Sequence, residues 1–264
     1  MEGGRGCVTQ IAADGRSRRT IAVTGEPNGL TVDGENVLWV ADTGPPALIR
    51  LELDGRFERV LTAFGAEAFV YPNDLCFGPD GMLYLTESGI TDADLAPGGV
   101  FRPDWKTVAL DGRVYRIHPR SLEIEPLAGG IRYANGLAFG PDDALYVAET
   151  LSGAILRFEW SGGTLGEPLV FGNVNDPAKP DVFRGPDGMA FDVDGNLYVA
   201  VFGQGDVTVL DRGGDVVRRI ETPGKQTTNV CFGLDDSEQL YVTEYEHGHL
   251  ERLDVGVRGF PLWG

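Results

Sequence analysis

The stretch ANGLAFGPDDALYVAE, residues 134–149, is one of five copies of a single pattern in this chain of 264 residues. Each copy opens with an Asn or Asp at the head of an apolar strand, turns, and returns as a strand of the type Leu-Tyr-Val-Ala that usually ends in an acid. The opening residue returns after 45, 62, 52 and 42 residues, close to the period of a four-stranded propeller blade. The repeat therefore predicts an all-β propeller. The five opening residues are Asn28, Asn73, Asn135, Asp187 and Asn229.

The segments between these strand pairs also have the character of strands. In the third copy we expect strands at residues 136–139, 145–148, 154–158 and 168–171, separated by turns rich in Gly, Pro, Asn and Asp. Strong helix signals are nearly absent from the chain. Because one architecture accounts for almost all of it, we expect a single domain over residues 1–264.

The two ends of the chain differ from its middle. Residues 7–12 and 20–23 read as the outer two strands of a blade that has no inner strands ahead of them. Residues 250–255 and 259–262 are expected to be the third and fourth strands of the last blade. We therefore predict a six-bladed β-propeller that lacks the inner two strands of its first blade, with a five-bladed ring carrying two extra edge strands as the alternative. The predicted segments are an outer half-blade, 1–24, and blades at 25–66, 67–129, 130–174, 175–223 and 224–264.

The second blade is the longest because residues 89–111 are inserted between its second and third strands. In a blade, the first strand leaves one face and the second returns to it, so this loop lies on the face where the opening Asn and Asp residues begin. We expect it to overhang that face as a lid or pocket wall, with an ordinary surface loop as the alternative.

Composition narrows the classes of partner. The formal net charge of −18 and the pI of about 4.5 argue against nucleic acid, which needs a basic surface to neutralise its phosphates. Three cysteines leave at least one unpaired, which favours a reducing, cytoplasmic location. No apolar run approaches the length of a bilayer span, and residues 1–20 lack the apolar centre of a signal peptide, so no membrane partner is expected. An open ring exposes strand edges, which makes a monomer or a weak dimer the expected state.

The opening residues are the candidates for chemistry. The first strand of each blade lines the centre of a propeller, so the five opening side chains should converge there. Amide carbonyls and a carboxylate are hard oxygen donors that suit Ca²⁺ or Mg²⁺. Any one Asn-Gly or Asp-Gly alone is more often a turn former, and five of one chemical type at one blade position favour a metal site over that alternative. His247-Gly248-His249, in contrast, is interpreted as a surface hairpin.

At residues 71–74, 135–142, 186–192 and 253–257 the sequence resembles the senescence-marker-protein/gluconolactonase/luciferin-regenerating-enzyme (SGL) family. The resemblance covers essentially the whole chain, and it implies a six-bladed propeller with one catalytic divalent cation that hydrolyses lactones or, in some relatives, phosphotriesters. Asn73, Asn135 and Asp187 match three of the four metal-ligand positions of that family. The fourth, a Glu on the first inner strand, has no match here, and Glu26 is expected to be a loop residue.

The resemblance further implies metal-assisted hydrolysis with Asp187 as the catalytic base. The protein is then a calcium-dependent lactonase of gluconolactonase type that acts on a small-molecule ester, with Zn²⁺, Mg²⁺ or Mn²⁺ as alternative cations. Tyr71 stands where the family has an Arg, which makes sugar-acid lactones less certain substrates. The competing hypothesis is a non-catalytic propeller that binds a small ligand or a protein on the same face. Residues expected to contact substrate or support the ligands are Asn28, Tyr71, Glu87, Trp105, Glu149, Asn229 and Glu244.

Overall fold

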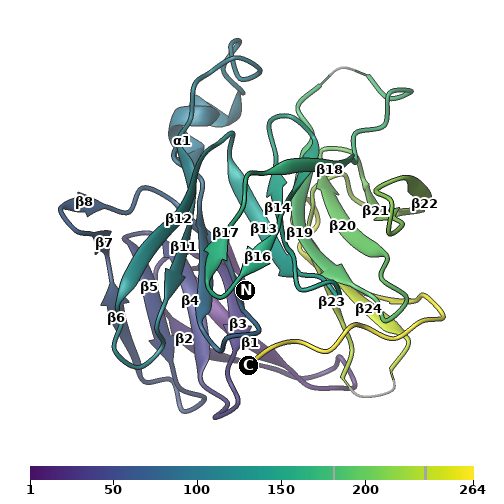
Figure 1. Ribbon diagram of the computed structural model, residues 1–264. Coiled ribbons are helices and arrows are strands. Elements are labelled where there is room, and N and C mark those ends of the chain that lie inside the picture. Colours follow the sequence, from purple (N-terminus) through teal and green to yellow (C-terminus); the bar gives the residue numbers. More distant parts are fainter. Residues whose placement is uncertain (181, 235–236) are drawn as a thin grey trace.

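The computed structural model describes residues 1–180, 182–234 and 237–264, and it is an all-β propeller, as predicted (Figure 1). Five sheets form the blades, and each is an antiparallel meander whose strands follow chain order from the centre outward. Blades 1 and 2 consist of β3 (Pro27–Val32), β4 (Leu38–Thr43), β5 (Pro46–Leu51) and β6 (Phe57–Leu61), then β9 (Pro72–Phe77), β10 (Leu83–Glu87), β11 (Gly112–Ile117) and β12 (Ile124–Ile131). Blades 3 and 4 consist of β13 (Ala134–Phe139), β14 (Leu145–Glu149), β15 (Ala154–Phe158) and β18 (Leu169–Asn173), then β19 (Gly185–Phe191), β20 (Leu197–Phe202), β21 (Asp206–Leu210) and β22 (Val216–Glu221). Blade 5 consists of β23 (Thr227–Phe232), β24 (Gln239–Glu244) and β25 (His249–Asp254).

The first residues form the separate pair that the sequence predicted. Strands β1 (Cys7–Ile11) and β2 (Arg18–Val23) make a two-stranded sheet, which packs on blade 1 through Val8 and Ala22. Among the described residues there are thus five blades and this outer pair, rather than six blades. Two further hairpins decorate blades 2 and 3: β7 (Ala63–Phe64) with β8 (Glu67–Ala68), and β16 (Trp160–Ser161) with β17 (Thr164–Leu165).

The predicted fourth strand of the last blade is wrong. Residues 259–262 leave blade 5 and cross beneath blade 4, where the Phe260 N–H donates to the Phe191 carbonyl at 2.8 Å. Gly259 forms a bridge with Asp192, and the chain ends beside Val32 and Phe77. Of the apolar residues that suggested an outer strand, Phe260 is partly buried in the cluster around Phe191, and Leu262 is exposed.

One aromatic contact repeats between blades and explains the Leu-Tyr-Val pattern. In blades 2, 3 and 4 the tyrosine of the second strand projects onto a phenylalanine at the end of the next blade's first strand. The ring centroids lie 4.8 Å apart for Tyr84 and Phe139, and 4.8 Å apart for Tyr146 and Phe191, both near perpendicular. Edge-to-face pairs are the favoured arrangement of aromatic rings. The repeated tyrosine is therefore a wedge that holds neighbouring blades together.

The inserted loop of blade 2 is ordered and covers one end of the propeller (Figure 1). It contains a short helix, α1 (Asp92–Leu95), and a 3₁₀ turn at Pro97–Gly99. Another 3₁₀ turn, Gly3–Arg5, lies before β1. Leu95 is 2% exposed and joins Ile90, Tyr133 and Leu151 in one apolar cluster. This segment, residues 88–111, is called the lid below.

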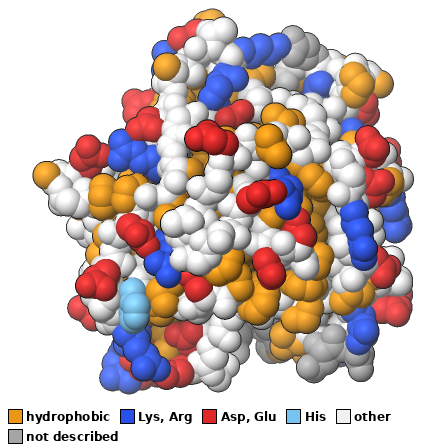
Figure 2. All heavy atoms as spheres, in the orientation of Figure 1, with side chains coloured by type: hydrophobic (Ala, Val, Ile, Leu, Met, Phe, Trp, Pro, Cys, Tyr) orange, Lys and Arg blue, Asp and Glu red, His pale blue; other side chains and the backbone are white. Residues whose placement is uncertain are grey.

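The outer surface matches the composition. Figure 2 shows acidic and basic side chains interspersed over the face that it draws, without a continuous basic stripe. In the described part of the chain, the structure contains no helix with the length and apolar character needed to cross a membrane.

Candidate functional site

Two of the predicted ligands, Asn73 and Asn135, are held by the same type of hydrogen bond. Asn73 Nδ2 donates to Ser88 Oγ at 2.9 Å, and that hydroxyl donates to the Ala134 carbonyl at 2.9 Å. In the next blade, Asn135 Nδ2 donates to Thr150 Oγ1 at 3.1 Å, and that hydroxyl donates to a carbonyl of blade 4 at 2.8 Å. In each case a hydroxyl that follows the second strand fixes the amide nitrogen. The amide oxygen is thereby left available for another partner.

That oxygen has no partner at Asn135. Asn135 is 6% exposed, and its Oδ1 atom is buried without a hydrogen bond. An unpaired buried acceptor costs about 1–3 kcal/mol, so such an atom in a native fold calls for an explanation. A hard cation supplies one, because amide oxygens are ordinary ligands of Ca²⁺. The residues present therefore fit the cation that the resemblance implies.

Asp187 lies next to the Asn135 side chain. It is half-buried, and its carboxyl is within hydrogen-bond reach of the Asn135 side chain. Burial raises the pKa of Asp187 well above the ordinary value, and the charges of Asp74 and Asp92 raise it further. A carboxylate crowded by other carboxylates is stabilised by a nearby cation, and the Asn135 amide and the Asp187 carboxylate already meet here. The structure brings Asp187 and Asn135 together.

Asp74 is a site residue that was not predicted. Three blades have Gly directly after the opening residue, at Gly29, Gly136 and Gly188, because the neighbouring inner strand passes too close for a side chain. Blade 2 has Asp74 at this position. Burial raises the pKa of Asp74 to about 7. The signal was present in the repeat, since Asn73-Asp74 departs from the Asn-Gly of its neighbours.

Asp92, on the lid, is the second residue that was missed. Its carboxylate accepts hydrogen bonds from the Tyr71 hydroxyl at 2.6 Å and from the Tyr133 hydroxyl at 2.8 Å. Burial raises the pKa of both tyrosines, and the Asp92 charge adds to the shift. Tyr71, a predicted substrate contact, is therefore tied to the lid. No repeat marks Asp92, because the lid occurs in one blade only.

The acids that end the second strands bind the backbone. Glu87 accepts the Tyr71 N–H at 2.7 Å, and Glu149 accepts the Arg132 N–H at 2.9 Å. Asp42 does the same for the Glu26 N–H at 3.0 Å. These carboxylates hold the backbone of the segments that lead into the first strands. They therefore help to position the opening residues of those strands.

The remaining predicted residues lie around the site in different ways. Asn229 contacts Gly188, but its Oδ1 accepts the Val230 N–H at 2.8 Å and is thus engaged. Asn28 is half-buried at the head of β3. Trp105 belongs to the lid, where its ring lies 5.3 Å from that of Phe183 and borders a cavity of about 270 Å³.

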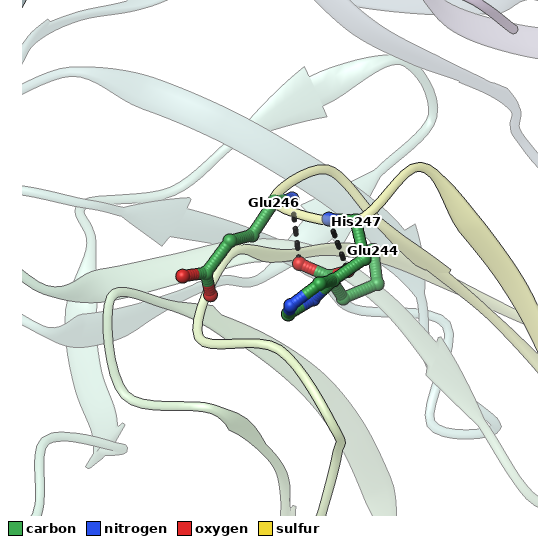
Figure 3. A group of neighbouring side chains, drawn as sticks. All are labelled: Glu244, Glu246 and His247. Carbon is green, nitrogen blue, oxygen red and sulfur yellow. Dashed lines mark hydrogen bonds and ion pairs between the residues drawn. The ribbon is translucent and has the colours of Figure 1, made fainter.

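Glu244 belongs to another group, which Figure 3 shows on the hairpin between β24 and β25. Side-chain ligand atoms of Glu244, Glu246 and His247 lie within 4.8 Å of one another. The Glu244 oxygens accept the N–H groups of Glu246 at 2.6 Å and His247 at 2.8 Å, and Glu246 accepts the Lys225 N–H at 2.7 Å. The carboxylates thus already serve the local backbone, as the other strand-end acids do.

The comparisons with known proteins identify the family and the fold. A model of the SMP-30/gluconolactonase/LRE-like region matches residues 48–246. The gluconolactonase of Zymomonas mobilis is 28% identical over 225 residues, which are 82% of this chain and 60% of the relative. The chain thus spans less than two thirds of that relative's length. A gluconolactonase structure from Xanthomonas campestris has a TM-score of 0.75 at 27% identity and covers 92% of this chain and 77% of its own.

A more distant structure supports the fold alone. It is the calcium-binding protein regucalcin from Agrobacterium tumefaciens, with a TM-score of 0.76 at 21% identity, covering 98% of this chain and 86% of its own. The family match includes 199 of the 264 residues and contains Asn73, Asn135 and Asp187. This chain therefore belongs to the SMP-30/gluconolactonase/LRE-like family.

Proposed function

We propose that this protein is a lactone hydrolase that uses one divalent cation, Ca²⁺ in the first place, at the end of the propeller covered by the lid. The observation that carries the proposal is the buried, unpartnered Oδ1 of Asn135, on a side chain that contacts the Asp187 carboxyl. The lactonase names of the relatives support the reaction class. A carboxylate and oriented amide oxygens support the cation.

The roles of the residues follow from their contacts. Asn73, Asn135 and Asp187 would hold the cation, and Ser88 and Thr150 keep the two amides in the orientation that presents oxygen. When bound, the cation would polarise the lactone carbonyl and stabilise the negative charge that develops on its oxygen.

Two carboxylates are available to take the proton of the attacking water. The sequence assigned this role to Asp187, but a carboxylate that binds a cation is a weak base. Asp74 is close enough for its charge to raise the pKa of Asp187, and its own pKa of about 7 suits proton transfer near neutral pH. We therefore propose Asp187 as ligand and Asp74 as general base.

The test begins with removal of the metal. Protein stripped with EDTA should lose hydrolysis of aldono-1,4-lactones and aromatic lactones, measured by proton release in a pH-stat. Added Ca²⁺ should restore hydrolysis. The same titration with Mg²⁺, Mn²⁺ and Zn²⁺ shows which cation the protein prefers. Turnover that survives complete chelation would overturn the cation's role, and no turnover with any cation would favour a binding propeller.

The hydroxyls that orient the amides provide a second prediction. Thr150→Val keeps the shape of the side chain but frees Asn135 Nδ2, so the amide can rotate and present nitrogen. Supporting groups of this kind typically contribute about 10–100-fold to metal affinity, and we expect a loss in that range by calorimetric titration with Ca²⁺. Thr164→Val, at an exposed position of β17, is the matched control and should leave the affinity unchanged. Equal affinity in both variants would contradict the orienting role.

A further inference from the structure

The cluster of Tyr71, Asp92 and Tyr133 is built from two blades and the lid. Tyr71 and Tyr133 occupy the same place in neighbouring blades, two residues before Asn73 and Asn135. Their rings lie 6.3 Å apart, and their hydroxyls bind the two different oxygens of the Asp92 carboxylate. Two hydrogen bonds to one carboxylate fix its position and its plane. The cluster therefore fixes a negative charge close enough to Asp187 to act on it.

Tyr133 adopts a backbone conformation that glycine would adopt more easily. Its φ is +67°, in the left-handed region, while its side chain is 7% exposed. The conformation is imposed by its surroundings, since the Thr150 N–H donates to the Tyr133 carbonyl at 3.1 Å and the Leu151 N–H to the Arg132 carbonyl at 3.3 Å. Strain of this kind is retained where a side chain is needed. The contact that the Tyr133 hydroxyl makes is the one with Asp92.

Several acidic side chains gather around this cluster. Asp74 and Asp92 raise the pKa of Asp187, and Glu26 adds to the acidic charges around Tyr71. The adjacent cation, Arg132, is directed elsewhere, because its guanidinium donates to the Lys106 carbonyl on the lid. A substrate that enters here meets carboxylates and tyrosine hydroxyls.

We propose that Asp92, held by Tyr71 and Tyr133, is a specificity-determining residue that favours uncharged lactones over lactones bearing a carboxylate or phosphate group. The inference rests on the proposed hydrolase function and adds its substrate class. A fixed carboxylate repels an anionic substituent within several ångströms, and it accepts hydrogen bonds from the hydroxyl groups of a neutral sugar lactone. Asp92 remains exposed, so the repulsion is moderated by solvent and salt.

The experiment compares two substrates that differ at one group. Glucono-1,4-lactone carries a terminal hydroxymethyl group, and glucaro-1,4-lactone carries a carboxylate in its place. With saturating Ca²⁺, the kcat/KM of the wild type should favour the neutral lactone, and added salt should reduce this preference. Asp92→Asn should lower the neutral-to-anionic ratio about five- to tenfold, since it removes the charge and keeps the shape.

Two further variants separate charge from structure. Asp94→Asn removes the same charge from the same short helix, but Asp94 binds Thr91 instead of the tyrosines, so the ratio should stay within twofold of wild type. Tyr133→Phe keeps the ring and removes one hydrogen bond to Asp92, and it should shift the ratio in the direction of Asp92→Asn by a smaller factor.

The outcomes distinguish the two proposals. A wild type that hydrolyses neither sugar lactone overturns this inference, and the proposed function falls with it only if aromatic lactones are not hydrolysed either. If the wild type is active and the ratio is the same in Asp92→Asn, or if Asp94→Asn shifts it equally, Asp92 is not a specificity residue and the hydrolase proposal stands. A shift confined to Asp92→Asn and Tyr133→Phe supports the inference.

Discussion

Asp187→Ala should lower kcat/KM for lactones about 10³-fold and remove measurable Ca²⁺ binding. Asp187 supplies the formal charge among the three predicted ligands, and removal of a single electrostatic group of this kind costs about 10²–10³-fold in turnover even without loss of a metal. Calorimetric titration and pH-stat kinetics on the same preparation would measure both effects. Asp194→Ala is the control, because Asp194 is an exposed acid in the turn that connects β19 with β20 of the same blade.

The same substitution should not weaken the fold in the absence of a cation. The pKa of Asp187 is raised in the folded state, so ionising it costs more in the folded protein than in the unfolded chain. That cost is absent below the unfolded pKa and grows as pH rises above it, and near neutral pH the carboxyl destabilises the cation-free protein. Asp187→Ala should therefore melt at the same temperature as EDTA-treated wild type or higher. A clearly lower melting temperature would mean that lost activity reflects lost structure.

The fold was largely predictable because the same sequence pattern repeats in every blade. The opening residue of each inner strand and the Leu-Tyr-Val of the following strand recur once per blade. Their spacing in the sequence therefore reveals the blades. The strand at residues 250–255 was confirmed as β25, within one residue at each end. The expected strand at 259–262 was wrong because Phe260 packs on a distant blade instead of pairing with β25. Phe260 pairs with Phe191 of blade 4, and nothing in a short apolar run shows which sheet will bury it.

The candidate site was predictable only where it shares the repeat. Asn135 and Asp187 stand at equivalent positions, and equivalence in sequence became proximity in space. Asp74 breaks the Asn-Gly pattern, so a residue-by-residue alignment of the copies would have identified it. Asp92 had no such signal, because it lies in the lid and its partners are tyrosines in two blades. Contacts between an insertion and a repeat depend on how the insertion folds back, which composition does not encode.

Tyr84→Ala should reduce the free energy of unfolding by about 3–5 kcal/mol, the cost of deleting a large buried aromatic side chain. Tyr84 is fully buried between blades 2 and 3, with its ring 4.8 Å from that of Phe139. Its hydroxyl accepts the Trp160 Nε1–H at 2.7 Å and donates to Asp80 at 3.2 Å. Truncation therefore also removes the partner of the Trp160 indole N–H, whereas Asp80 keeps its ion pair with Arg116. Urea denaturation would measure the loss.

Two further tyrosine variants identify the origin of the lost stability. Tyr84→Phe keeps the wedge and removes only the hydroxyl, so it should lose about 1–2 kcal/mol. Tyr245→Ala removes a tyrosine that is 65% exposed and should change stability by less than about 0.5 kcal/mol.

Because blades 2 and 3 carry Asn73 and Asn135, a wedge that sets their spacing also sets the separation of the two amide oxygens. Tyr84→Ala should therefore weaken Ca²⁺ binding although Tyr84 lies outside the site, whereas Tyr84→Phe should preserve it; unchanged binding in both would mean that the inner strands keep their spacing without the wedge.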